Sequence, residues 1–272
     1  MSYGYRARRS AFTLVELLVV IGIIAVLVGI LLPSLSKARN QAALVKCLSG
    51  IKQLHNAMIF YVNENKQYLP YTGWGDFPNA GPATSGSYVA DWLFDPALAL
   101  SKHGGVWNQI EVQEGALWPS LGGKMEIFRC PLDVGPWNGS QICTSYIMNG
   151  AMSGFSHESP KYHPHRITEF HPGNAVLWET STRGTANNDP SNYPQETVTF
   201  THAGGTSVVF IDGHAETFSI KRWATELGFG PSALWCAPTD LPGGDNVGGW
   251  AADGGSKTVW TPVKNNDGYT FQ

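Results

Sequence analysis

The sequence lacks several features that would place it in a common functional class. Its formal net charge is only −3, so a broadly basic surface for nucleic acid is not indicated. GxSxG, HExxH and Walker patterns are absent, which argues against the enzyme classes that use them. The four cysteines show no CxxC spacing, so a zinc ribbon is not predicted either. We therefore expect no nucleic acid partner and no enzymatic activity.

One long apolar run is present. Residues Phe12 to Leu32 are apolar or glycine except Thr13 and Glu16, and Pro33 follows directly. About 20 apolar helical residues cross the roughly 30 Å hydrocarbon core of a bilayer, so the run predicts one membrane span. An ionisable residue inside a span is costly and usually marks a functional site. The alternative is that Glu16 is incidental and reaches the headgroups.

The segment before this run is basic. Arg6, Arg8 and Arg9 crowd the first eleven residues, and no acidic residue accompanies them. By the positive-inside rule this end stays in the cytoplasm, and the remainder lies outside the cytoplasmic membrane. A secretory signal is cleaved after its apolar segment, but no A-x-A-like site follows Leu32. Cleavage before Phe12 would instead leave the apolar segment on the mature protein.

Helical periodicity continues beyond Pro33. Apolar residues recur at intervals of three and four, at Leu44, Leu48, Ile51, Leu54, Met58 and Tyr61. This spacing predicts an amphipathic helix with one apolar stripe. Residues 12–61 could thus form one helix of about 50 residues, interrupted or kinked at Pro33.

The rest of the chain predicts short strands and loops. Residues 71–90 are rich in Gly, Pro, Ser and Thr and indicate a loop, and the tail from Gly228 shows no periodicity. Apolar and β-branched runs predict strands at 175–180, 196–202, 206–211 and 214–220. Asp212-Gly213 is a strong hairpin signal between the last two. The fold class is therefore α+β, with a long N-terminal helix packed on an antiparallel β-sheet in a loop-rich domain.

The stretch "AFTLVELLVVIGIIAVLVGILLPSLSKAR" resembles the N-terminal signal of type IV pilins and type II secretion pseudopilins. That signal has a small residue before the cleavage site, Phe after it, Glu five residues in, and a proline near the end of the apolar stretch. Ala11, Phe12, Glu16 and Pro33 stand at those positions. Glycine is usual before the cut, so Ala11 departs mildly from the pattern.

A second resemblance covers the remainder. "HAGGTSVVFIDGH" has His202, nine residues and then Asp212-Gly213, and it is similar to the H-X9-DG segment of a group of prepilin-like proteins. "FRCPLD", "SYIMN", "RITEF" and "NAVLWET" fit the same group.

The first resemblance implies processing and assembly. A prepilin peptidase would cut between Ala11 and Phe12 and methylate the new amine of Phe12. In a filament, the Glu16 carboxylate would pair with the Phe12 amine of a neighbouring subunit and set the axial register. The implied partners are the prepilin peptidase, other pilin or pseudopilin subunits, the secretion or pilus machinery, and the membrane. The expected domains are a leader (1–11), a transmembrane helix (12–32), an amphipathic continuation (33–62) and a periplasmic or cell-surface pilin-like domain (63–272).

Other residues suggest ligands more weakly. His202, Asp212 and His214 could bind a divalent metal if a hairpin brought them together, although a plain turn with flanking histidines is favoured. His163 and His165 could add ligands. A glycine-rich tail could bind calcium, as some pseudopilins do, through Asp240, Asp245, Asn246 and Asp253. No EF-hand spacing is present, so a solvated loop is favoured there. We otherwise expect no cofactor. An exported domain also permits a disulfide, and Cys130 and Cys143 are the nearest pair, with free thiols equally open.

Three functions remain in order of preference. The first is a pilin-like or pseudopilin-like filament subunit. The second is a plain membrane tether carrying a binding module, whose aromatic loops "YTGWGDF" and "VGPWNG" would stack on glycans or other surface ligands. The third and weakest is a metal-dependent enzyme that uses His202, Asp212 and His214.

Overall fold

The structure is a computed structural model, and it describes part of the chain. The described residues are 13–73, 90–94, 111–134, 143–152, 164–180, 190–192, 194, 196, 198–202, 204–227, 232–234, 262–265 and 268–271. For 262–265 and 268–271 only the backbone is described. The chain divides into two compact units, residues 1–42 and residues 43–272.

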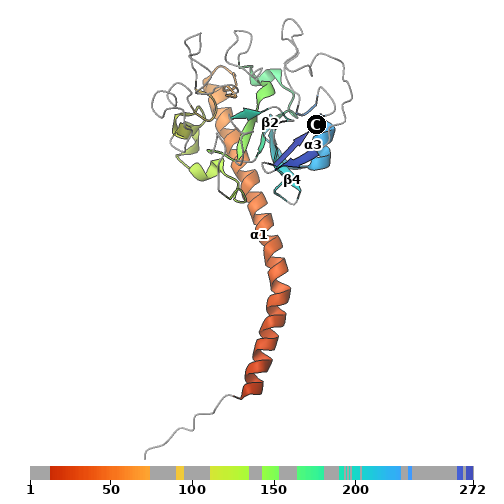
Figure 1. The fold of residues 1–272 in the computed structure, drawn as a ribbon. Helices are drawn as coiled ribbons and strands as arrows, with labels where there is room; N and C mark the ends of the chain where they lie inside the picture. The colour runs from red at the N-terminus through yellow and green to blue at the C-terminus, as the bar shows by residue number, and fades with distance from the viewer. Residues whose placement is uncertain are drawn as a thin grey trace, which may run out of the picture. The chain divides into compact units, whose positions relative to one another are not determined.

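Helix α1 (Leu14–Glu64) is a single element of 51 residues (Figure 1). It continues through Pro33, so the proline does not end it, although proline has no N–H to make the usual helical bond. From residue 13 to 42 every side chain is exposed. This is the only helix among the described residues that is long and apolar enough to cross a membrane.

The second unit is built around a five-stranded sheet with strand order β3-β1-β2-β4-β5. Its strands are β1 (Tyr146–Asn149), β2 (Ala175–Glu179), β3 (Ser191–Asn192), β4 (Gly205–Phe210) and β5 (Ala215–Ser219). The α+β prediction is confirmed. The sheet is mixed rather than wholly antiparallel, because β1 and β3 run parallel.

Shorter elements complete the unit. They are η1 (Glu111–Glu114), η2 (Trp118–Leu121), η3 (Met125–Phe128), η4 (Gly150–Met152), η5 (Ile167–Glu169) and α3 (Ile220–Leu227). Strands β6 (Pro262–Asn265) and β7 (Gly268–Phe271) form a separate antiparallel pair. The predicted strand at 196–202 is wrong: its described residues make only isolated bridges, such as that between His202 and Gly205.

Both faces of the sheet are covered, which explains why β1, β2 and β4 are buried along their whole length. Successive side chains of a strand point to opposite faces. Trp178 of β2 packs edge-on against Trp223 of α3, with ring centroids 5.3 Å apart. The next residue, Glu179, instead contacts Cys47 of α1. Strand β2 therefore lies between α3 and the C-terminal part of α1.

The predicted apolar stripe of α1 is present but rotated slightly. Ile51, Leu54 and Met58 are fully buried, as expected, whereas Leu44, Leu48 and Tyr61 are only half-buried at its margin. The centre of the stripe also includes polar or small residues, namely Cys47, Gly50 and His55. Gly50 permits close packing, since a Cβ there would lie 3.1 Å from the Ile127 carbonyl oxygen.

Candidate functional site

The first candidate site is the start of α1, where Thr13 and Glu16 form a reciprocal cap. Glu16 Oε2 accepts hydrogen bonds from the Thr13 backbone N–H (2.8 Å) and hydroxyl (2.7 Å). The Thr13 Oγ1 atom accepts one from the Glu16 backbone N–H (3.2 Å). This is the capping box of a Thr-x-x-Glu sequence, which satisfies N–H groups that a helix start leaves unpaired. Glu16 therefore has a local structural role that the family resemblance did not indicate.

The rest of this segment is apolar surface. The large side chains from Leu14 to Leu32 are between 44% and 78% exposed in the single chain. Ser34, directly after Pro33, donates its hydroxyl to the Leu31 carbonyl oxygen at 2.8 Å. The processing residues Ala11 and Phe12 lie outside the described residues, so cleavage and methylation remain predictions.

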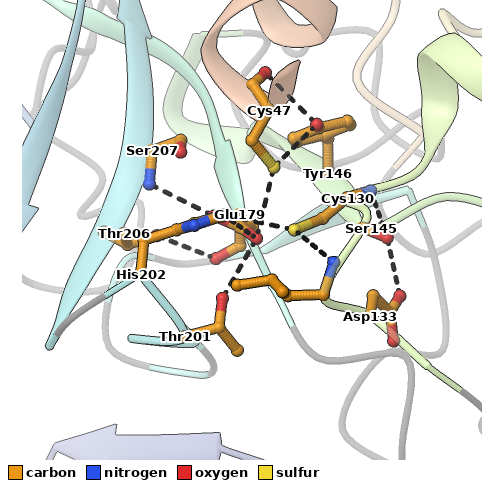
Figure 2. Close-up of polar contacts among 11 residues, drawn as sticks. Cys47, Cys130, Asp133, Ser145, Tyr146, Glu179, Thr201, His202, Thr206 and Ser207 are labelled. Carbon is orange, nitrogen blue, oxygen red and sulfur yellow. Dashed lines mark hydrogen bonds and ion pairs between the residues drawn. The ribbon is translucent and has the colours of Figure 1, made fainter. Parts of the chain in front are cut away.

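The second candidate site is a buried polar cluster in the second unit (Figure 2). Its four side chains come from separate segments: Cys47 from α1, Cys130 from the turn after η3, Glu179 from the end of β2, and His202 from the bridge before β4. The chain brings them together because α1 and the segment after η3 both pack on the sheet at the end of β2. All four are at most 4% exposed.

Distances within the cluster are short. His202 Nε2 lies 3.2 Å from Cys130 Sγ and 3.3 Å from Glu179 Oε1. Cys47 Sγ lies 3.6 Å from the same Glu179 oxygen. One donor atom from each of the four residues can be chosen so that all lie within 4.8 Å of one another.

Electrostatics in the cluster follow from burial and pairing. Burial by itself would lower the pKa of His202, but hydrogen bonds to Cys130 and Glu179 outweigh it and raise that pKa to about 10. Burial would likewise raise the pKa of Glu179, yet the hydrogen bond and charge of His202 bring it below its ordinary value. The hydrogen bond with Cys47, together with burial, raises the pKa of the Cys130 thiol. The cluster therefore holds an imidazolium–carboxylate pair beside the protonated thiol of Cys130.

A shell of further hydrogen bonds holds these groups in place. The Tyr146 hydroxyl lies 3.1 Å from Cys47 Sγ, and the Leu132 N–H donates to Cys130 Sγ at 3.4 Å. Glu179 accepts from the Thr201 hydroxyl at 3.2 Å and from the Ser207 N–H at 3.4 Å.

The predicted metal set of His202, Asp212 and His214 is not assembled. His202 lies before β4, whereas Asp212 and His214 follow the other end of that strand. The six residues of β4 span about 20 Å, which separates His202 from the other two side chains. Asp212 and His214 pair with each other at an exposed turn. His165 is also separate, since its Nδ1 atom lies 2.9 Å from Glu169 Oε2.

Of the two states left open for Cys130 and Cys143, a disulfide or two thiols, the structure has the thiols. Cys130 and Cys143 are both buried, and no disulfide joins them or Cys47. Cys130 contacts His202 instead, as described above. Several other predicted ligands lie outside the described residues: His163, and the acidic and amide residues Asp240, Asp245, Asn246 and Asp253. Most residues of the aromatic loops "YTGWGDF" and "VGPWNG" also lie outside the described part of the chain.

Two members of the cluster were missed from the sequence. Cys47 lies on the apolar stripe of α1, where a thiol is easily read as a small core residue. Glu179 ends a buried strand that is otherwise apolar, and this acidic residue in an apolar run was the available signal.

Comparisons with known proteins support the N-terminal assignment. Residues 6–32 match the model of the prokaryotic N-terminal methylation motif. The chain is 30% identical over 151 residues to the type II secretion system core protein G of Aeromonas hydrophila, covering 49% of this chain and 95% of that protein. No solved structure matches the chain. Since the similarity extends over nearly all of the relative and this chain also matches the N-terminal methylation motif, the chain belongs to the family of pilin-like and pseudopilin-like proteins.

Proposed function

We propose that this chain is a filament subunit, cleaved between Ala11 and Phe12, methylated on the Phe12 amine and assembled through the first part of α1. Its partners would be a prepilin peptidase, which makes the cut, and further pilin or pseudopilin subunits with their secretion or pilus machinery. Before assembly the protein would cross the cytoplasmic membrane once, with its N-terminus in the cytoplasm and residues 63–272 outside.

The proposal rests first on the exposed apolar surface of α1. Large side chains from Leu14 to Leu32 are exposed on every side of the helix, and all residues there are uncovered in the single chain. Water would not tolerate such a surface, so lipid or neighbouring helices must cover it. Lipid is as apolar as leucine, however, so apolar surface alone does not favour a bundle of subunits over the membrane.

Glu16 supplies the preference for assembly. A carboxylate within a membrane span is unfavourable, although less so near the end of the span, where Glu16 lies, than at its centre. Both hydrogen bonds from Thr13 are accepted by Oε2, and Oε1 accepts none from the described residues. The free oxygen could accept from the Phe12 amine of an adjacent subunit. A subunit displaced along the filament would lose this pairing, so the contact would select one register.

The experiment compares Glu16→Ala with the native chain in cells that form the filaments. Filaments are sheared and sedimented, and the protein is measured in the sedimented and membrane fractions. We expect Glu16→Ala to remain in the membrane and to be lost from the filament fraction. Glu126→Ala, which removes a carboxylate from η3 in the second unit, is the matched control and should still assemble.

The N-terminal mass of each variant must be measured as well. A start at methylated Phe12 shows that processing has occurred, so a loss of assembly can be assigned to the missing carboxylate. Normal incorporation of processed Glu16→Ala would contradict the register role. It would favour the alternative, a membrane tether that carries a binding module.

A further inference from the structure

The buried cluster of Cys47, Cys130, Glu179 and His202 is not explained by filament assembly. It lies in the second unit and is shielded from solvent, so it cannot touch another subunit. Burying two ionisable groups and two thiols at one point is unfavourable unless the groups satisfy one another or a bound ion. Apolar side chains of similar volume would fill the same space without this penalty.

The spacing of the donor atoms matches a tetrahedral metal site. Bonds of about 2.3 Å from zinc to sulfur and about 2.0–2.1 Å from zinc to nitrogen or oxygen place neighbouring ligands roughly 3.3–3.8 Å apart. The measured separations are 3.2 Å from His202 to Cys130, 3.3 Å from His202 to Glu179, and 3.6 Å from Cys47 to Glu179. The other pairs of donor atoms lie within 4.8 Å of one another, so the longest of them would have to shorten by up to about 1 Å to accept the ion.

The donor types decide which ion fits. Two soft sulfurs, one borderline imidazole nitrogen and one hard carboxylate oxygen form a mixed set, and all three donor types are zinc ligands. Calcium takes six to eight oxygen ligands and magnesium requires an octahedral oxygen site, so this cluster suits neither. Four protein ligands also leave no open position, as is usual for a zinc ion with a structural role.

The surrounding contacts are those expected around bound thiolates and carboxylates. The Tyr146 hydroxyl can donate to Cys47, and the Leu132 N–H points at Cys130 Sγ. The Ser207 N–H fixes the second oxygen of Glu179. Such outer contacts orient metal ligands and stabilise their charge.

We propose that Cys47, Cys130, Glu179 and His202 bind one Zn²⁺ ion that ties α1 to the sheet. The ion would link the long helix to three further segments: the one after η3, the end of β2 and the bridge before β4. This role is independent of filament assembly, and its failure would leave the proposed function intact.

The test uses the processed full chain, purified in detergent from cells supplied with zinc. Elemental analysis should find one Zn²⁺ per chain. Zinc X-ray absorption should show two sulfur ligands with nitrogen and oxygen. Removing the ion with a chelator should lower the midpoint of thermal unfolding by about 5 °C or more, and added Zn²⁺ should restore it.

Variants separate this cluster from other thiols and histidines. Cys130→Ser and His202→Asn should each lose the bound zinc. Cys143→Ser, a buried cysteine outside the cluster, and His214→Asn, at the exposed turn, should retain it. If a cluster variant unfolds, Co²⁺ provides a second measurement on the native chain: substitution should give the intense absorption of tetrahedral cobalt with thiolate ligands.

Three outcomes would overturn the proposal. The first is a chain without zinc that also fails to take up Zn²⁺ or Co²⁺. The second is a disulfide between Cys47 and Cys130 in the protein from native cells, found by peptide mapping without reduction. The third is zinc that persists in Cys130→Ser but is lost in His214→Asn, which would place the ion elsewhere.

Discussion

Gly213 packs directly against His55: a Cβ atom at position 213 would lie 3.0 Å from Cε1 of the imidazole. The glycine has a φ of +82°, which side chains with a Cβ rarely adopt. The Asp212-Gly213 turn thus joins β4 to β5 and also fits against the helix.

Gly213→Ala tests both roles of this glycine. Alanine would add backbone strain of about 1–2 kcal/mol and overpacking of about 1–3 kcal/mol against His55. Gly204→Ala is a matched control, because Gly204 has the same φ of +82° but nothing within 4 Å of its Cβ position. Denaturant unfolding should show a larger loss of stability for Gly213→Ala. Equal losses would mean that the contact with His55 contributes nothing.

The buried His55 predicts a loss of stability in weak acid. Burial and the positive charge of Lys52 lower the pKa of His55. The hydrogen bond to the Ile211 carbonyl and the negative charge of Asp212 raise it, but the net shift is downward. The unfolded chain, with an ordinary histidine pKa of about 6.5, then binds more protons than the folded chain below that pH. The free energy of unfolding should therefore fall as the pH drops from about 7 to 5, by at most about 1.4 kcal/mol per pH unit from this group.

His55→Gln isolates that contribution. Glutamine can donate to the Ile211 carbonyl, which His55 Nε2 contacts at 3.1 Å, but it does not titrate. Chemical unfolding at several pH values should show a shallower slope for the variant between pH 7 and 5. If both proteins have the same slope, His55 is not the group that responds.

Trp223 anchors α3 to the sheet. Its ring contacts Trp178, Phe200 and Phe218, and its Nε1–H donates to the Pro194 carbonyl oxygen at 3.0 Å. Trp223→Ala should destabilise the second unit by about 3–5 kcal/mol, as for other buried aromatic truncations. Phe60→Ala on the exposed side of α1 should change stability by less than about 0.5 kcal/mol. Thermal unfolding followed by circular dichroism measures both.

Thr13→Ala separates the cap of α1 from the proposed contact between subunits. Loss of the Thr13 side chain should destabilise the start of the helix by about 0.5–2 kcal/mol, but Glu16 keeps its charge. We therefore expect processed Thr13→Ala to enter filaments while Glu16→Ala does not. Sedimentation of sheared filaments, with the N-terminal mass as a check on processing, distinguishes them. Equal exclusion of both variants would assign the role of Glu16 to the helix cap.

The parts of the fold that were predicted depend on local patterns. Helix α1 follows from periodic apolar residues, and the β4–β5 hairpin follows from the apolar and β-branched runs on either side of Asp212-Gly213. Strand β1 was not predicted, because four buried residues carry no period and one of its neighbours is the two-residue parallel strand β3. Helix α3 was also missed, since its first residue, Ile220, continues the apolar pattern of β5.

The buried cluster could not be predicted for a different reason. Its residues stand at positions 47, 130, 179 and 202, and no local spacing relates them. His202 was singled out, but it was grouped with Asp212 and His214 because they are near in sequence. The six residues of β4 place these histidines at opposite ends of the strand.

The side chains of Trp178 and Glu179, at the end of β2, point to opposite faces of the sheet, and this favours one pairing register for the strand. Trp178 belongs to the aromatic side with Trp223, and Glu179 belongs to the polar side with Cys47. If β2 slipped by one residue against β1 and β4, the indole would enter the polar cluster and the carboxylate would enter the aromatic core. Both errors would be unfavourable at once. These two adjacent residues therefore fix the register of β2 and disfavour a pairing that is shifted by one residue.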